Sequence, residues 1–338
     1  MRNTSRPRAA SRCSALVATI VICLIGCSEA GPSSSSGSPD GCAETTSDPD
    51  AVLPGSVLFA RSGDGDVHTI FLLAAGCETQ LTEPGAYGLG RLSPDHRRVS
   101  VIPGGEIPPP LTGGTIDLEG RDFERFTLTD PTLNMIPGPW SPDASRMAFE
   151  AWDDSDPSRT GIYTARVSDG GDLVRVTTRP GPRHDIPLDY SPDGTQLVFY
   201  RSVHTDPDPQ VGGSLWVVGV DGTGAHRISG NAQPADWARW SPDGQKILFA
   251  TERTAPSGAL WTVSPDGSDL VELFVDPDGG FPITPTWSPD GSQILFGLDP
   301  TNDEFTHPDN SLVLIGSDGA DLQEIITTPD FKRWPEWW

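Results

Sequence analysis

The sequence is 338 residues long and carries 47 acidic against 23 basic side chains, a net charge of −24 at pH 7. A chain this acidic repels phosphate backbones and anionic headgroups. The charge therefore argues against nucleic acid as a partner and against electrostatic adsorption to a membrane.

The N-terminal segment, residues 1–27, has the organisation of an export signal. Four arginines precede or open an apolar stretch that ends at residue 25 and is too short to span a bilayer. The stretch runs into Leu24-Ile25-Gly26-Cys27, which resembles the lipobox of bacterial lipoproteins. The resemblance implies cleavage before Cys27 and acylation of its thiol, with an ordinary secretory signal or an uncleaved anchor as alternatives. Ser28 is not the Asp of inner-membrane retention, which favours the periplasmic face of the outer membrane or the cell surface.

Residues 28–54 are predicted to form a flexible tether, because they are rich in Ser, Gly, Pro and acidic residues. Without the signal, 19 basic and 47 acidic residues remain, a net charge of −28, so we expect only the lipid to contact the membrane. Of the five cysteines, Cys42 and Cys77 are left once the signal is removed and Cys27 is acylated. An even pair in an oxidising compartment predicts a disulfide, with two free thiols as the alternative.

A repeat occupies residues 55–338. Five segments share a Ser-Pro-Asp turn followed by an apolar strand, and their serines are spaced by 47 to 50 residues. These serines are Ser93, Ser141, Ser191, Ser241 and Ser288. Each unit continues into a second alternating run, an Asp-Gly turn in most units, and a fourth short run, which is the pattern of four strands joined by hairpins. A repeat of this length with several short strands predicts a propeller blade.

The ends of the repeat region predict how the ring closes. Trp337 lies 50 residues after Trp287, so it belongs to an inner strand with no further strands after it. Residues 56–61 match the second strand of a blade whose inner strand is missing. We expect the C-terminal strand to complete this first blade, which leaves no open edge in the ring. The predicted fold class is all-β, a six-bladed β-propeller with four-stranded blades.

The repeats resemble the TolB-like, WD-repeat-like propeller family, whose signature is a Trp-Ser-Pro-Asp-Gly turn before an apolar strand. Complete copies start at Trp240 and Trp287, and Tyr190 replaces the Trp in a third. The resemblance covers residues 55–338 and implies a propeller fold. The first two copies have His96 and Ala144 in place of Gly, so we expect looser turns in the second and third blades.

Residues that recur at the repeat period are expected to be structural. The aromatic residue at each motif start is predicted to pack between blades, with a sugar-stacking platform as the alternative. The motif aspartates are predicted to hold their turns by bonding to nearby backbone N–H groups. They are Asp95, Asp143, Asp193, Asp243 and Asp290.

Functional residues are expected in the loops that differ between blades. The loops between second and third strands and those between blades should emerge on one face. Candidates for a binding face there are Asp153, Asp156, His184, His204, Asp206, Asp208, Asp299 and His307. Residues 276–279 begin like a calcium loop, but Trp287 stands where the twelfth-position Glu should be, which excludes an EF-hand. A weaker, structural calcium site stays open, and no other cofactor is predicted.

The sequence favours a non-catalytic binding module: a monomeric, lipid-anchored propeller of the cell envelope that recruits a protein or peptide. No G-x-S-x-G nucleophile motif occurs, and the propeller takes up the whole exported chain. A propeller enzyme acting on polysaccharide is the alternative, because some lyases have TolB-like repeats. Such an enzyme would need Arg159, Arg179, Arg183 and His184 to converge in one pocket. A purely structural, calcium-stabilised ring is a third hypothesis.

Overall fold

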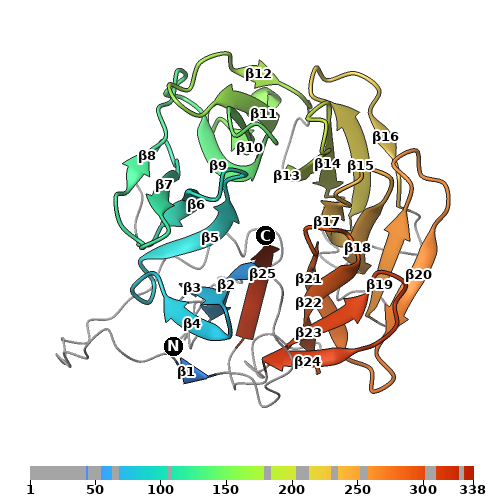
Figure 1. Ribbon diagram of the computed structural model, residues 1–338. Helices are drawn as coiled ribbons and strands as arrows, with labels where there is room; N and C mark the ends of the chain where they lie inside the picture. Colours follow the sequence, from blue (N-terminus) through green and yellow to red (C-terminus); the bar gives the residue numbers. More distant parts are fainter. Residues whose placement is uncertain are drawn as a thin grey trace, which may run out of the picture.

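Six antiparallel sheets stand around a common axis, along which Figure 1 looks. The computed structural model describes residues 43–44, 55–62, 68–105, 109–178, 184–202, 213–229, 235–251, 258–300, 310–326 and 331–338. Within these ranges the regular structure is β-strand except for one short 3-10 helix, η1 (Pro157–Arg159). The predicted six-bladed β-propeller is confirmed.

The blades are numbered in chain order, and the strands of each blade follow one another from the innermost to the outermost. Blade 1 has β25 (Phe331–Trp337), β2 (Ser56–Ser62), β3 (His68–Ala74), β4 (Cys77–Gln80) and β1 (Ala43–Glu44); blade 2 has β5 (Tyr87–Leu92), β6 (Arg98–Pro103), β7 (Gly114–Asp117) and β8 (Glu124–Arg125). Blade 3 has β9 (Asn134–Trp140), β10 (Arg146–Trp152), β11 (Gly161–Arg166) and β12 (Val174–Arg175); blade 4 has β13 (Asp185–Tyr190), β14 (Gln196–Arg201), β15 (Ser214–Gly219) and β16 (His226–Arg227). Blade 5 has β17 (Ala235–Trp240), β18 (Ile247–Thr251), β19 (Ala259–Val263) and β20 (Val271–Val275); blade 6 has β21 (Phe281–Trp287), β22 (Gln293–Asp299), β23 (Ser311–Gly316) and β24 (Gln323–Ile326).

The ring closes as predicted, through the C-terminal strand. β25 pairs with β2, with Val57 opposite Trp337. Trp338, just after β25, exchanges two backbone hydrogen bonds of 2.9 and 3.0 Å with Ser56. Lys332, fully buried at the start of β25, donates from Nζ to the Asn310 carbonyl of blade 6 at 2.8 Å. The last strand therefore completes blade 1 and ties it to blade 6.

Blade 1 has one strand more than predicted. β1 adds to the outer edge of β4, with Ala43 opposite Glu78. Cys77, at the start of β4, is disulfide-bonded. Its predicted partner Cys42 lies outside the described residues, as do Cys27, the export signal and most of the tether, so these stay predictions. Among the described residues, no helix has the length and apolar character needed to cross a membrane.

The motif aromatics are buried, with at most 8% of each residue exposed, and they join successive blades. The indole Nε1 of Trp140 in blade 3 donates to the Arg91 carbonyl of blade 2 at 3.1 Å. Trp287 in blade 6 donates in the same way to the Arg239 carbonyl of blade 5 at 3.4 Å. A ring that packs and bonds against the next blade is not free to stack on a sugar.

The motif turns have one geometry in all five copies. Each motif aspartate accepts a hydrogen bond from the motif serine hydroxyl, at 2.6 to 2.7 Å, and one from a backbone N–H two residues on. The looser turns expected at His96 and Ala144 are not observed: their N–H groups reach the serine carbonyl at 2.8 Å, as that of Gly194 does. The side-chain bonds hold both residues in the left-handed region, at φ of 56° and 57°, where Gly194 has 72°.

Candidate functional site

One position of the repeat lies on the inner strands and carries charge in four of the six blades. It is the residue two places before the motif serine, or before Trp338 in blade 1, and it holds Arg91, Pro139, Asp189, Arg239, Thr286 and Glu336. Two of these residues are cationic and two are anionic, so the four charges balance when all are ionised.

Three of these side chains form a polar bridge, made of Arg91, Arg239, Glu336 and the carbonyl of Leu188. Glu336 Oε1 accepts from Arg91 Nη1 at 3.0 Å and from Arg239 Nη2 at 2.6 Å. The Leu188 carbonyl accepts from Arg91 Nη2 at 3.0 Å and from Arg239 Nη1 at 3.3 Å. Blades 2 and 5 stand opposite each other in the ring, and so do blades 1 and 4 (Figure 1). The polar bridge therefore crosses the centre of the ring.

Asp189 adds a second acidic group beside the polar bridge. Its carboxylate accepts hydrogen bonds from the backbone N–H groups of Trp240, at 2.9 Å, and Tyr190, at 3.0 Å. Burial raises the pKa of Asp189 to about 7, although the Trp240 N–H and the charge of Arg91 oppose the shift. Burial also raises the pKa of Glu336, again against Arg91. Both carboxyl groups are thus held by hydrogen bonds from other blades of the ring.

Sequence reasoning missed this site, although the signal was available. The position falls directly before the start of each motif, and it is charged in four copies and uncharged in two, while its neighbours repeat. Charge at an inner-strand position of a repeat has to be balanced across the ring, since an unpaired buried charge is costly. Aligned on their motifs, the six copies show charges at this position that need partners, and the closed ring decides which of them meet.

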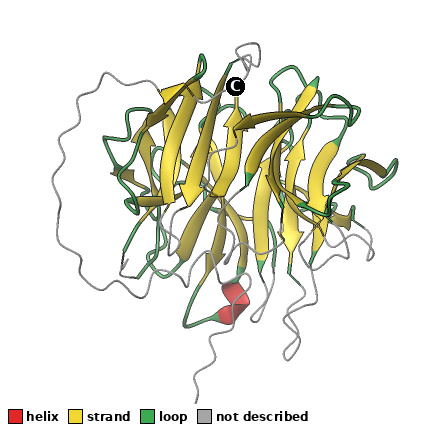
Figure 2. Cartoon of the chain, turned by 90° about the horizontal axis from the view of Figure 1, so that it is seen from below, coloured by secondary structure: helices red, strands yellow, loops and turns green. Residues whose placement is uncertain are grey.

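The predicted binding-face candidates of blade 3 are held within their own loop. Asp153 is 6% exposed; its Oδ1 accepts from Ser155 and its Oδ2 from Arg159 Nη1 at 2.8 Å. The Ser155 bonds are the main reason that the pKa of Asp153 falls to about 2. Asp156 caps η1 by accepting from the Ser158 N–H at 3.0 Å. Figure 2 shows η1 on the face of the ring away from Trp338. Both aspartates thus shape the loop.

The remaining described candidates do not gather with them. His184 Nδ1 lies 2.5 Å from Glu150 Oε1 of blade 3, and this hydrogen bond is the main cause of the raised pKa of His184. Asp299, at the end of β22, is fully buried, so the expectation that it forms part of a surface is wrong. His204, Asp206, Asp208 and His307 lie outside the described residues. The described residues hold no group of three His, Cys, Asp or Glu side chains that could bind a metal ion.

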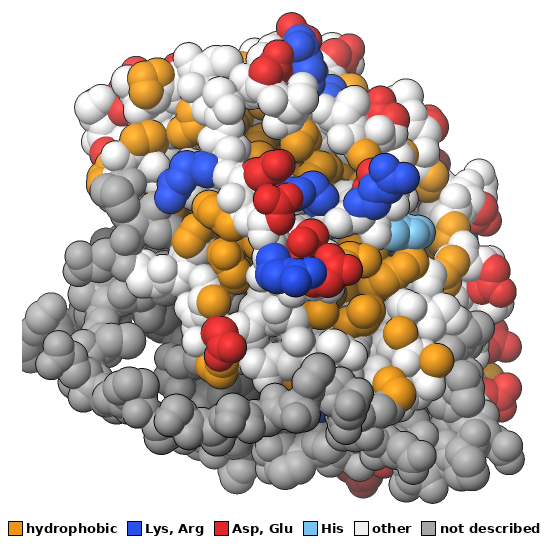
Figure 3. Space-filling model, turned by 60° about the vertical axis from the view of Figure 1, so that its left-hand side comes forward, with side chains coloured by type: hydrophobic (Ala, Val, Ile, Leu, Met, Phe, Trp, Pro, Cys, Tyr) orange, Lys and Arg blue, Asp and Glu red, His pale blue; other side chains and the backbone are white. Residues whose placement is uncertain are grey.

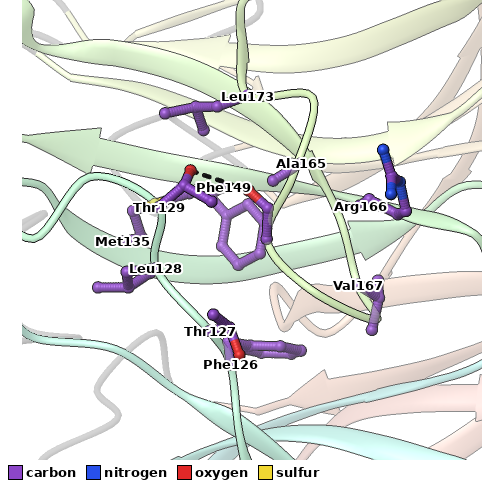
Figure 4. Close-up of a pocket in the computed structure, with 11 residues that line it drawn as sticks. Phe126, Thr127, Leu128, Thr129, Met135, Phe149, Ala165, Arg166, Val167 and Leu173 are labelled. Carbon is purple, nitrogen blue, oxygen red and sulfur yellow. Dashed lines mark hydrogen bonds between the residues drawn. The ribbon is translucent and has the colours of Figure 1, made fainter.

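A pocket in blade 3 is too small for a ligand. Its volume is about 10 Å³, room for one water at most. Figure 4 shows Phe126, Met135 and Phe149 lining it, and the Thr129 hydroxyl closes it by donating to the Gly170 carbonyl at 3.0 Å. It is a packing gap where the segment after β8 crosses from blade 2.

Basic side chains are distributed unevenly around the ring. Residues 87–177, in blades 2 and 3, hold nine arginines, many of them ion-paired, as Arg98 is with Asp122 at 3.2 Å. The side of the ring that Figure 3 brings forward shows such basic and acidic side chains next to each other. Residues 254–331, from the outer part of blade 5 through blade 6, hold fourteen acidic residues and no lysine or arginine.

Two curated bacterial proteins are similar to parts of this chain, and no protein-family model matches it. Protein Atu1656 of Agrobacterium fabrum is 31% identical over 143 residues, and the peptidase YuxL of Bacillus subtilis is 28% identical over 90; both are described as uncharacterized. The matches cover 42% and 27% of this chain but 41% and 14% of those proteins. This chain thus spans less than half the length of the curated relatives it matches.

Solved structures show the same architecture. TolB from Acinetobacter baumannii superposes with a TM-score of 0.62 at 16% identity, over 83% of this chain and 66% of that one. The chain has the fold of the TolB-like propellers. An oligogalacturonate lyase in complex with manganese shares it (TM-score 0.55, 15% identity, 81% of this chain and 74% of that one). So does a puromycin hydrolase (TM-score 0.53, 16% identity, 81% and 45%). At these identities the likeness establishes the fold alone.

Proposed function

We propose that this chain is a non-catalytic, lipid-anchored binding module of the bacterial cell envelope, which recruits a protein or peptide partner. The polar bridge is the observation that carries the proposal. It places four blades in direct contact across the ring, where propellers with small-molecule sites need space for a ligand. Binding is then left to the two faces and the perimeter of the ring, surfaces that suit a macromolecule.

The lipid anchor rests on Cys27 and the lipobox around it. Cys27→Ser should abolish incorporation of labelled fatty acid into the protein, because the acceptor thiol of the lipid is lost. Unchanged labelling of the variant would contradict the anchor and leave the propeller's role untouched.

The binding role is tested by affinity capture from envelope extracts after crosslinking. The bait is the exported chain without its lipid, residues 28–338, which keeps β1 and Cys42, and the control is the same chain with loops 153–160 and 203–212 replaced by short Gly-Ser linkers. A partner enriched over an unrelated acidic protein supports the proposal, whether or not the loops are needed. Recovery of nothing above that unrelated protein would contradict it.

A polysaccharide-cleaving propeller is the second candidate, favoured by the likeness to the manganese-bound lyase. Two of the four residues that such a site would use are described, and each is engaged elsewhere. Arg159 is ion-paired with Asp130 and Asp153, and His184 is bound to Glu150. Cleavage of oligogalacturonate in the presence of manganese would establish this candidate against the binding module.

A structural calcium ion is tested separately. Asp276, in the segment that begins like a calcium loop, uses Oδ2 to accept from the Gly280 N–H at 2.7 Å, which closes a tight turn. If calcium stabilised the ring, adding a chelator would lower the melting temperature, and adding calcium back would restore it.

A further inference from the structure

The outer strands of the six blades differ in length and in what covers them. β8, β12 and β16 have two residues each and β24 has four, whereas β20 has five; all five strands end their sheets. In blade 1 the outer edge of β4 is covered by β1. Among the described residues, no strand pairs with the outer edge of β20. Proteins avoid leaving such an edge exposed, since its free N–H and C=O groups invite another strand.

The surface around β20 is apolar. Of the five large hydrophobic residues that stand exposed in the described structure, three lie on or beside β20 and one on the adjoining part of blade 6. Their exposed fractions are 38% for Leu270, 47% for Val271, 40% for Val275 and 48% for Leu322. Neither Pro nor Lys occurs in β20, although it carries Glu272 and its register with β19 is irregular at Leu273.

Blade 6 contacts β20 at Leu273. The turn at Gly319, with φ of +85°, comes so close to the Leu273 carbonyl that a Cβ at Gly319 would lie 2.1 Å from its oxygen. Only glycine allows this approach. Blades 5 and 6 are therefore in tight contact at the perimeter, and β20 is held in place before any partner arrives.

The stretch of sequence that holds β20 carries formal charge of one sign. Fourteen acidic residues and no lysine or arginine occur in residues 254–331. Lys246 and His226, from outside this stretch, reach the turn before β20 at Ser264 and Pro265. The acidic residues exposed on or near β20 in blades 5 and 6 are Asp266, Asp269, Glu272, Asp278, Asp318, Asp321 and Glu324. A strand that docked at this edge would bring its own side chains among these carboxylates, so it would be favoured by lysine or arginine.

We propose that the outer edge of β20 is a docking strand, which pairs with an extended segment of a partner protein in which apolar residues alternate with lysine or arginine. The backbone of the segment bonds to the free edge, its apolar side chains cover Val271 and Val275, and its basic side chains meet the carboxylates. The pairing of β1 with β4 is the same kind of addition in blade 1. This inference rests on the proposed binding role and assigns it a surface.

Segments of this chain suit the edge less well. A second copy would oppose one acidic β20 with another. The tether, residues 28–54, carries five acidic residues and no basic one. Both would place like charges side by side, which is unfavourable.

The first experiment uses a fluorescent synthetic peptide of about six residues, a typical strand length, in which valine and lysine alternate. The variant V271K/V275K should bind it about tenfold more weakly than the unmodified protein, because two like charges replace the apolar contact. Val174→Lys is the matched control: Val174 is 40% exposed on the two-residue edge strand β12, and its variant should bind normally. Glu272→Lys, at an exposed position, gives a second variant if the double one unfolds.

Two further readouts separate strand pairing from adsorption of a basic peptide to an acidic surface. Bound peptide should slow hydrogen exchange at residues 271–275, and N-methylation of alternate peptide bonds should abolish binding, since it removes backbone donors but no charge. Equal binding by the N-methylated peptide or by V271K/V275K would overturn the proposal.

The capture experiment distinguishes this inference from the proposed function. A partner recovered by the unmodified propeller but lost with V271K/V275K supports both. A partner retained by V271K/V275K supports the binding role and overturns the docking strand. Dimers that form in the unmodified protein but not in V271K/V275K would assign the edge to a second copy and overturn the partner chemistry.

Discussion

The centre of the ring and its perimeter are built from the same repeat, yet their charges are arranged in opposite ways. At the centre, Arg91, Arg239 and Glu336 meet in the polar bridge, each satisfied by groups from other blades. On the perimeter of blades 5 and 6, acidic residues stand in a stretch without lysine or arginine. The charges on the inner strands must therefore complement one another across the ring, whereas the residues of the outer strands can differ from blade to blade.

The largest effect expected at the centre is a pH dependence of stability. The pKa of Asp189 is raised to about 7 from 3.8, so the folded protein keeps a proton that the unfolded chain releases. This stabilisation is complete below about pH 4 and is lost as the pH rises through about 7. Asp189→Asn should remove about 3 kcal/mol of the decline between about pH 5 and pH 8, measured by urea unfolding. An unchanged slope would contradict the burial of this carboxyl group.

The motif aspartates make stability depend on pH in the opposite direction. Hydrogen bonds from the motif serines lower their pKa values, in Asp290 to about 2. The stability they contribute is present above about pH 4 and lost as the pH falls through their folded-state pKa values. Stability should therefore be highest near about pH 5.

The next effect compares the same repeat position in two blades. Arg239→Ala should lower the free energy of unfolding by about 2 kcal/mol, since Glu336 and the Leu188 carbonyl each lose a charged donor. Pro139→Ala, at the equivalent position of blade 3, should lower it by less than about 1 kcal/mol. Equal losses at the two positions would mean that the hydrogen bonds of the polar bridge do not add to the free energy of unfolding.

The motif turns lie between centre and perimeter and should respond more weakly. Ala144→Gly should raise the free energy of unfolding by about 1 kcal/mol, because glycine adopts φ of 57° without steric strain. Gly194→Ala should lower it by about as much. Thermal unfolding of the two variants measures both shifts, and a destabilised Ala144→Gly would show that the alanine methyl group packs favourably.

The smallest effect is expected on the perimeter. Val271→Lys and Val174→Lys should each change the free energy of unfolding by less than about 0.5 kcal/mol, because both side chains are already largely solvated. Denaturant unfolding measures this. A large loss at Val271 alone would make β20 part of the core and would remove the contrast between centre and perimeter.

The sequence was sufficient for most of the fold because the repeat constrains it many times over. The serine spacing predicted the blades, and the match of Trp337 to Trp287 predicted their closure. The polar bridge was not predicted, since Arg91, Arg239 and Glu336 meet only after the ring closes. Asp299 was assigned to a variable loop, yet it ends a strand and is buried. A loop that varies between the repeats shows where the sequence can change. Whether a side chain in it points to solvent or into the core depends on packing, which the repeat pattern does not reveal.

The pairing of β25 with β2 has a consequence for how the molecule is made. Residues 56–62 leave the ribosome long before residues 331–337, the neighbours they need. Five blades can each form from one continuous stretch of chain, but the first to be synthesised keeps an exposed inner edge throughout translation. Contacts between such distant segments are slow to form. A stalled or truncated product that lacks β25 would therefore have an open ring, in which the exposed inner edge of β2 could pair with other chains.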